Sequence, residues 1–142
     1  MKLKKPGRSM ADDVVINKTA TVERCLERIK EDYDAEFRQN YTKQDAIILN
    51  IERACQACID IAAHFVKARK LGVPQDSRDT FVLLQQEGII DEKLSQKLQA
   101  MVSFRNIAVH DYTSLNLDIV IAIVEEHLSD FTDFTHVVLQ RF

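Results

Sequence analysis

Apolar residues recur at intervals of three and four positions over long stretches of the chain, which is the spacing of one face of an α-helix. The first such stretch is 12–33, where the apolar positions are Val15, Val22, Leu26 and Ile29. A broader apolar face runs through 43–71 and comprises Ile47, Ile48, Ile51, Ala54, Cys55, Cys58, Ile61, Ala62 and Phe65. The pattern predicts two long amphipathic helices in the first half of the chain.

The ends of the second helix carry their own signals. Thr42 stands directly before it, with Asp45 three positions on, which is the spacing of a capping box. Gly72 and Pro74 follow the last apolar position and predict where the helix ends.

Three further helices are expected in the second half. Asp76 or Ser77 opens a short one, and Asp91 caps a fourth that is predicted to extend through Tyr112. A long final helix is predicted from Leu117 onward, burying Ile119, Val120, Ile123, Val124, Leu128, Phe131 and Phe134. The predicted fold class is all-α: an antiparallel helical bundle of about five helices, four main and one short.

Composition agrees with helices. The chain has 142 residues, and 46% of them are apolar. It has only 3 Gly and 2 Pro, which are too few turn-forming residues for a multi-stranded β fold. The length suits one domain, expected over 11–142. Residues 1–10 (MKLKKPGRSM) are interpreted as a disordered leader or cloning remnant. No apolar run reaches the roughly 20 residues that span a bilayer, so no membrane contact and a cytoplasmic location are expected.

Charge and cysteines narrow the function classes. Removing the four basic residues of the segment 1–10 from the total of 19 leaves 15 against 22 acidic residues, a net charge of −7. A negative net charge disfavours non-specific binding along a nucleic acid, so RNA binding requires basic side chains that lie close together. Cys55-x-x-Cys58 lies inside the apolar helix and has no second ligand pair. With Cys25, these residues are predicted to be buried free thiols, and no metal site is expected.

The segment Ser103–Tyr112 concentrates the chemistry. Arg105 supplies a permanent cation and His110 a side chain that ordinarily titrates near neutral pH. On one helix Arg105 and Tyr112 share a band about 60° wide with Leu94, Leu98 and Met101. A charge on such an apolar stripe needs a partner, or the stripe borders a cleft.

Asn106 and His110 share a different face with Ser103. His110 lies about 140° around the helix from Arg105 and about 7.5 Å along it. The two can act together only if the helix frays, if the side chains bend around it, or if a second copy of the chain contributes.

The spacing Arg-Asn-x-x-Val-His-x-Tyr over 105–112 resembles the HEPN ribonucleases and, within them, the HepT-type toxins of toxin–antitoxin pairs. The resemblance implies a metal-independent endoribonuclease that needs no cofactor, with the motifs of a homodimer lining one cleft. It makes Arg105 and His110 catalytic and Asn106 and Tyr112 supporting residues. The implied partners are an RNA substrate (tRNA or mRNA) and a minimal nucleotidyltransferase antitoxin, which adenylylates Tyr112 (AMPylation).

Three alternatives remain open on the residues alone. Arg105 could pair with Asp111 or Glu126 and lock the last two helices, while Tyr112 fills a gap in the core. The chain could be a non-catalytic HEPN module that binds RNA or nucleotide, or presents a substrate to a nucleotidyltransferase. It could also be a plain helical oligomerisation domain.

Overall fold

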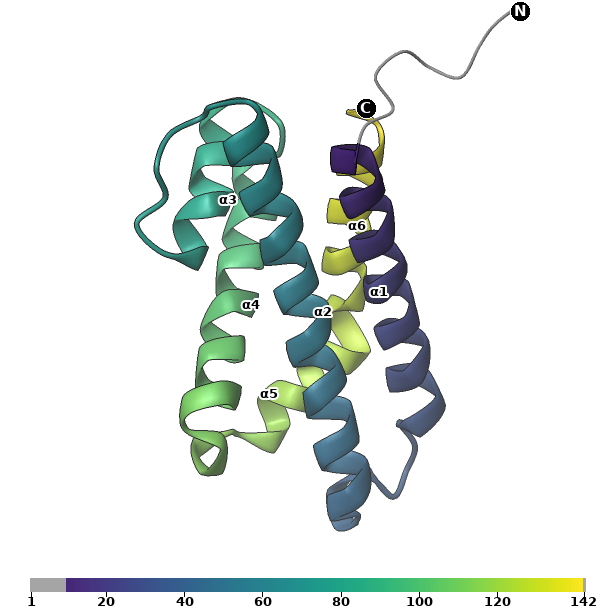
Figure 1. Cartoon of the computed structure of the whole chain (residues 1–142). Coiled ribbons are helices and arrows are strands. Elements are labelled where there is room, and N and C mark those ends of the chain that lie inside the picture. Colours follow the sequence, from purple (N-terminus) through teal and green to yellow (C-terminus); the bar gives the residue numbers. More distant parts are fainter. Residues whose placement is uncertain (1–9, 142) are drawn as a thin grey trace, which may run out of the picture.

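Two long antiparallel helices, α1 (Met10–Asp32) and α2 (Tyr41–Ala68), lie side by side along the molecule (Figure 1). A single-turn 3₁₀ helix, Phe37–Gln39, connects them. The computed structural model describes residues 10–141. The predicted leader 1–10 lies outside the described residues except for Met10, at which α1 begins.

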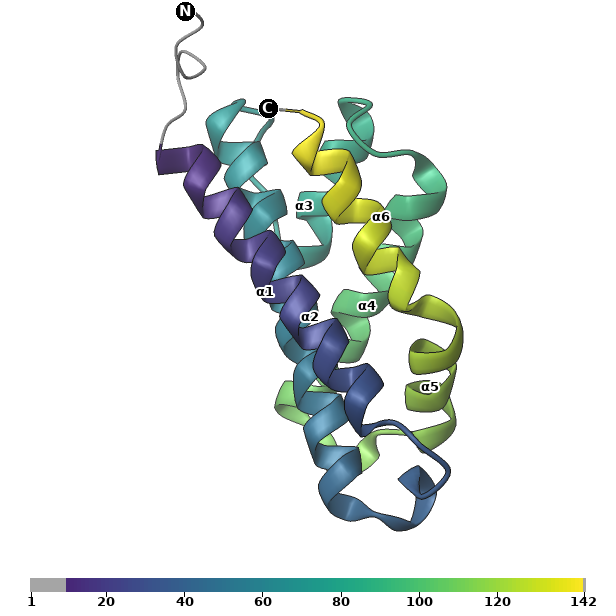
Figure 2. The same cartoon turned by 90° about the vertical axis from the view of Figure 1, so that its right-hand side faces the viewer.

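The rest of the chain completes a bundle around this pair. Its elements are α3 (Ser77–Gln86), α4 (Glu92–His110), a 3₁₀ turn (Tyr112–Ser114), α5 (Leu117–Ala122), a π-helical turn (Ile123–His127) and α6 (Leu128–Leu139). Helix α4 packs on α2, α6 packs on α1, α2 and α4, and the short α3 covers α2 and α4 near one end (Figures 1 and 2). The all-α bundle of four main helices and one short helix is confirmed.

The core is the one that apolar periodicity predicts. Every apolar position that the pattern assigned to the faces of the first two helices is buried. All three cysteines are also buried and free, as predicted. Phe81 of α3 meets Phe134 of α6 edge to face, with ring centroids 5.5 Å apart, and joins the short helix to this core. Within 10–141, no helix is long and apolar enough to cross a membrane.

Both predicted ends of α2 are wrong by a few residues. The cap is Asn40, whose side chain accepts from the Lys43 N–H at 3.0 Å, so Thr42 lies inside the first turn. At the other end Lys70 adopts a left-handed conformation, with φ of 53°, and the Leu71 N–H bonds the Val66 carbonyl. This hydrogen-bond pattern closes a helix through a residue in the left-handed region, here before Gly72 is reached.

Helix α4 ends at His110 and not at Tyr112 as predicted. Asp111 leaves the helical region, with φ of −152° and ψ of 59°. Its carboxylate accepts from the Ser114 hydroxyl at 2.6 Å, and its carbonyl accepts from the Ser114 N–H. Local bonds of this kind compete with helix continuation. Tyr112 therefore does not share a helical face with Arg105.

The predicted single final helix is interrupted. The π turn Ile123–His127 separates α5 from α6, and the wider turn inserts a residue that shifts the side-chain register. Of the predicted inward positions, Val120, Ile123, Phe131 and Phe134 are buried, but Ile119 is 53% exposed, so that prediction is wrong. Helix α5 crosses from the lower end of α4 towards α6 (Figures 1 and 2).

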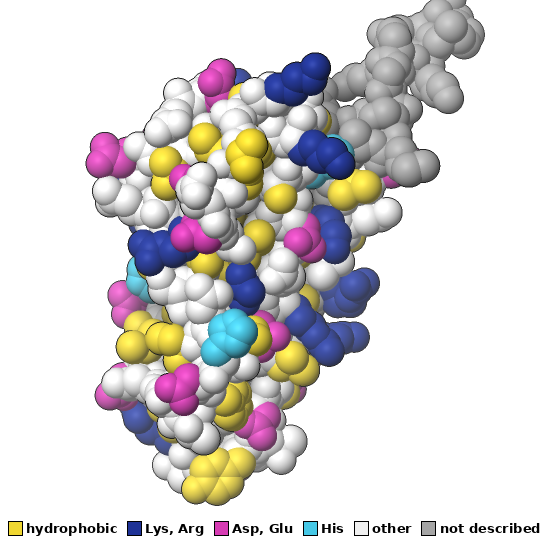
Figure 3. All heavy atoms as spheres, turned by 60° about the vertical axis from the view of Figure 1, so that its left-hand side comes forward, with side chains coloured by type: hydrophobic (Ala, Val, Ile, Leu, Met, Phe, Trp, Pro, Cys, Tyr) yellow, Lys and Arg dark blue, Asp and Glu magenta, His cyan; other side chains and the backbone are white. Residues whose placement is uncertain are grey.

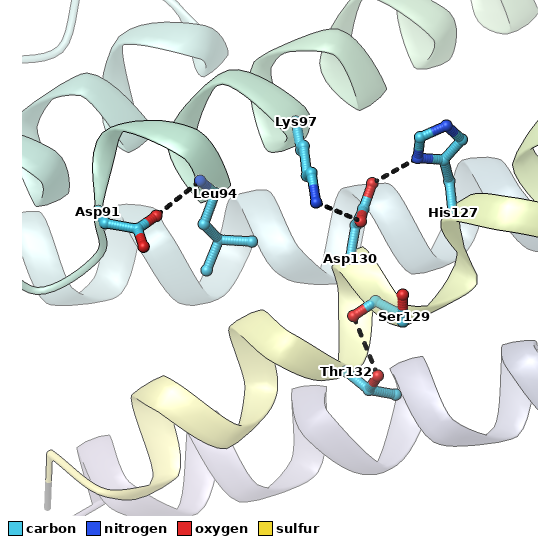
Figure 4. Close-up of polar contacts among 7 residues, drawn as sticks. All are labelled: Asp91, Leu94, Lys97, His127, Ser129, Asp130 and Thr132. Carbon is cyan, nitrogen blue, oxygen red and sulfur yellow. Dashed lines mark hydrogen bonds and ion pairs between the residues drawn. The ribbon is translucent and has the colours of Figure 1, made fainter.

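Asp130, in the first turn of α6, is a buried carboxylate that the fold uses to join α6 to α4. It meets Lys97 Nζ of α4 at 3.8 Å and His127 Nδ1 at 3.1 Å (Figure 4). A buried carboxylate is tolerated when cations and hydrogen bonds compensate it, and a helix N-terminus favours a negative charge. These contacts give Lys97 and His127 a structural role.

Candidate functional site

Arg105 lies half-buried where α4 faces the start of α3 and the middle of α2. Its Nη2 donates to the Ser77 hydroxyl at 3.1 Å, and its Nε is buried with no hydrogen-bond partner in the described chain. Burial raises the pKa of Cys55 on α2 to about 12, and the positive charge of Arg105 acts against that shift. Arg105 makes no ion pair within 10–141. A cation held by a neutral hydroxyl retains its capacity to bind an anion such as a phosphate.

A second arginine lies on α3, the short helix that carries Ser77, and contacts α4 from there. Arg78, exposed on α3, donates through Nη1 to the Ser103 hydroxyl at 3.1 Å. Ser103 donates in turn to the Gln99 carbonyl, which holds the acceptor in place. Two reciprocal Arg–Ser contacts therefore link α3 to α4. Neither Ser77 nor Arg78 belongs to a motif in the sequence, because the contacts depend on how the two helices pack.

His110 is the last residue of α4 and is exposed. The structure records no hydrogen bond from either ring nitrogen to another described residue, and the same is true of the Asn106 side chain one turn earlier. Arg105 points to α3, so the described chain does not join Arg105 and His110 by a hydrogen bond. The divergence predicted from helical geometry is present in the folded chain.

Tyr112 reaches across to α2, where its hydroxyl donates to the Asp45 carboxylate. Partial burial and the neighbouring carboxylate together raise the pKa of Tyr112 to about 12. The side chain is still 42% exposed. The phenol keeps its proton and donates it in a hydrogen bond to the carboxylate, which can accept that proton if the hydroxyl oxygen acts as a nucleophile.

The pairs named in the structural alternative are not found among the described residues, although the two Arg–Ser contacts do link α3 to α4. Arg105 bonds Ser77 of α3 and pairs neither with Asp111 nor with Glu126. Tyr112 is too exposed to fill a gap in the core.

An apolar groove of about 270 Å³ runs between α4 and α5; its lining includes Ala100, Met101, Phe104, Ile119, Ala122 and Ile123. We call it the α4–α5 groove. Ile119 on one wall is 53% exposed, and Ile107, one turn beyond Phe104 on α4, is 43% exposed. Ile107 also precedes His110 by three positions, so this apolar surface adjoins the face that carries the histidine.

The sequence of the chain matches a known protein family and a characterised relative. Residues 21–138 match the family described as Ribonuclease HepT-like. The mRNA nuclease HepT of Shewanella oneidensis is 51% identical over 129 residues, which are 89% of this chain and 97% of that protein.

Solved structures agree with the sequence match. The tri-AMPylated Shewanella oneidensis HEPN toxin in complex with an MNT antitoxin superposes with a TM-score of 0.87 at 51% identity, over 90% of this chain and 98% of that one. A toxin–antitoxin crystal structure with AMP-PNP gives a TM-score of 0.88 at 50% identity, over the same shares. The chain therefore belongs to the HepT-like ribonuclease family of HEPN toxins.

Proposed function

We propose that this chain is the RNA-cleaving toxin of a toxin–antitoxin pair and that Arg105 and His110 carry the reaction. The observation that supports this most strongly is the state of Arg105. It is a half-buried guanidinium with a neutral hydroxyl as partner and a buried Nε that has none in the described chain. Such a site is completed by an anion, and the scissile phosphate of RNA supplies one.

The proposed reaction needs only these side chains. His110 accepts the proton of a ribose 2′-hydroxyl as its oxygen attacks the adjacent phosphorus. The bond from phosphorus to the 5′-oxygen breaks, and a protonated His110 donates a proton to that oxygen. Arg105 stabilises the charge that develops on the phosphate oxygens, and Asn106, one turn from His110, orients the imidazole once RNA is bound.

The first test is cleavage by the purified chain. We expect RNA to be cut equally well with and without EDTA, because no step uses a metal, and DNA of the same sequence to survive, because it lacks the 2′-hydroxyl. The products are resolved on a denaturing gel. Cleavage that stops in EDTA, or equal cleavage of DNA, contradicts the proposal.

Arg105 and His110 point apart on one α4, and a homodimer would allow the two residues to meet across two subunits. The α4–α5 groove, with Ile107 and Ile119, is an apolar surface that borders the His110 face. A second copy seated on this surface buries it and places two copies of the motif around one cleft, so that Arg105 of one subunit serves His110 of the other.

Ile119→Asp should therefore yield a monomer that does not cut RNA, because a carboxylate in the groove opposes burial of the apolar surface. Mass is measured by light scattering, and cleavage on the same samples. Ile16→Asp is the matched control: Ile16 is 39% exposed on α1, away from α4. An Ile119→Asp chain with unchanged mass and activity refutes this interface.

We further propose that the substrate is mRNA and that an MNT-type antitoxin silences the chain by AMPylation, as the names of its relatives indicate for those proteins. Tyr112 is the proposed acceptor. Its hydroxyl oxygen attacks the α-phosphorus of ATP, pyrophosphate leaves, and Asp45 accepts the phenolic proton. The added AMP places a negative phosphate and a bulky base beside the cleft, where it competes with RNA.

A further inference from the structure

We propose that Arg78 is a second phosphate-binding residue for RNA and holds the strand on the face of α4 that carries His110. The inference rests on the proposed function and adds to it a residue from outside the motif. The chain as a whole is acidic, so it can bind RNA only where basic side chains lie close together. Arg78 would add one such side chain near His110.

The position of Arg78 follows from the residue it contacts. Ser103, Asn106 and His110 are spaced three and four apart, so they form one stripe along α4. Arg78 donates to Ser103, so its guanidinium lies at one end of that stripe. His110 lies at the other end, about 10 Å along the helix axis. Arg105 leaves α4 on a different face, whereas Arg78 contacts the stripe directly through Ser103.

Arg78 has no direct ion-pair partner among the described residues. The neighbouring carboxylates are engaged elsewhere: Asp76 accepts from the Asp79 N–H, and Asp79 accepts from the Gln75 N–H, each at 2.9 Å. Figure 3 views the side where α3 and α4 lie and shows Lys and Arg side chains, interspersed with Asp and Glu side chains, around an exposed histidine.

The hydrogen-bonding capacity of Arg78 is also largely free. A guanidinium carries five N–H donors, and the structure assigns one contact, to Ser103. The contact fixes the approach of the side chain and leaves the rest of the fork for a phosphate, to which arginine can bind with two parallel bonds. Arg105 then holds the scissile phosphate, and Arg78 holds another phosphate of the same strand.

The test is RNA binding by chains that also carry His110→Ala. Affinity for a labelled single-stranded RNA is measured by fluorescence anisotropy over a range of salt concentrations. Arg78→Ala should weaken binding by about tenfold and make the slope of log K against log salt shallower by about 0.7, the value for one lost contact to a single strand. Arg78→Lys keeps the charge, so it should keep the slope while losing part of the affinity.

Arg28→Ala is the control, since Arg28 is an exposed arginine on α1, which packs on α2 and α6. If Arg78→Ala matches Arg28→Ala in affinity and slope while the wild-type chain cuts RNA, the role of Arg78 is refuted and the proposed function stands. If the wild-type chain does not cut RNA but binding depends on Arg78, the nuclease proposal fails and the phosphate site stands. Absence of any RNA binding overturns both.

Discussion

Replacing His110 by alanine is expected to slow RNA cleavage by about 10²–10⁴-fold, the usual contribution of one general acid–base group. The side chain is exposed at the last position of α4, and no hydrogen bond ties it to the described part of the chain, so the fold should be unaffected. The rate is measured on a labelled RNA, and thermal unfolding is followed on the same protein. Induction of the variant in cells should no longer arrest growth.

His136→Ala is the matched control because His136 is an exposed histidine on α6, away from the motif. Its cleavage rate should equal that of the wild-type chain. A His110→Ala chain that still cuts RNA at the wild-type rate removes His110 from the mechanism. A silent wild-type chain in the growth assay favours a non-catalytic module or a plain oligomerisation domain.

The helices were predictable because each buries a continuous apolar face, and that signal extends over many residues. Their ends were not, because an end is decided by one or two residues. Lys70 has a left-handed backbone conformation and ends α2 before Gly72. The Asp111 carboxylate accepts a hydrogen bond from the Ser114 hydroxyl at the end of α4. The exposure of Ile119 likewise depends on where α5 lies in the bundle, which apolar spacing does not encode.

The candidate site shows the same difference between what local sequence predicts and what depends on packing. That Arg105 and His110 diverge follows from helical geometry alone and needs no tertiary information. The contacts Arg105–Ser77 and Arg78–Ser103 join residues 28 and 25 positions apart, and Tyr112–Asp45 spans 67. No periodicity encodes such pairs, because they exist only once α3 and α2 have packed against α4. Asp45 was predicted only as part of a helix cap and is instead the partner of the tyrosine.

Tyr112→Phe is expected to abolish incorporation of AMP into the chain, because phenylalanine lacks the oxygen that attacks the nucleotide. The chain is mixed with its antitoxin and ATP, and the added mass is located by peptide mass spectrometry. In cells the variant should keep part of its toxicity while escaping the antitoxin, because Arg105 and His110 are intact. Tyr41→Phe is the control: Tyr41 is 79% exposed and begins the same helix that carries Asp45.

Asp45→Asn separates the role of the carboxylate from that of the phenol. Partial burial, the hydrogen bond to Asp45 and the negative charge of Asp45 raise the pKa of Tyr112 to about 12. An amide removes the charge, so the phenol should ionise at lower pH, which an ultraviolet titration of tyrosinate detects. AMP transfer should nevertheless slow, because asparagine cannot accept the proton during attack. AMP found on Tyr112→Phe, or unchanged transfer in Asp45→Asn, places the acceptor or the base elsewhere.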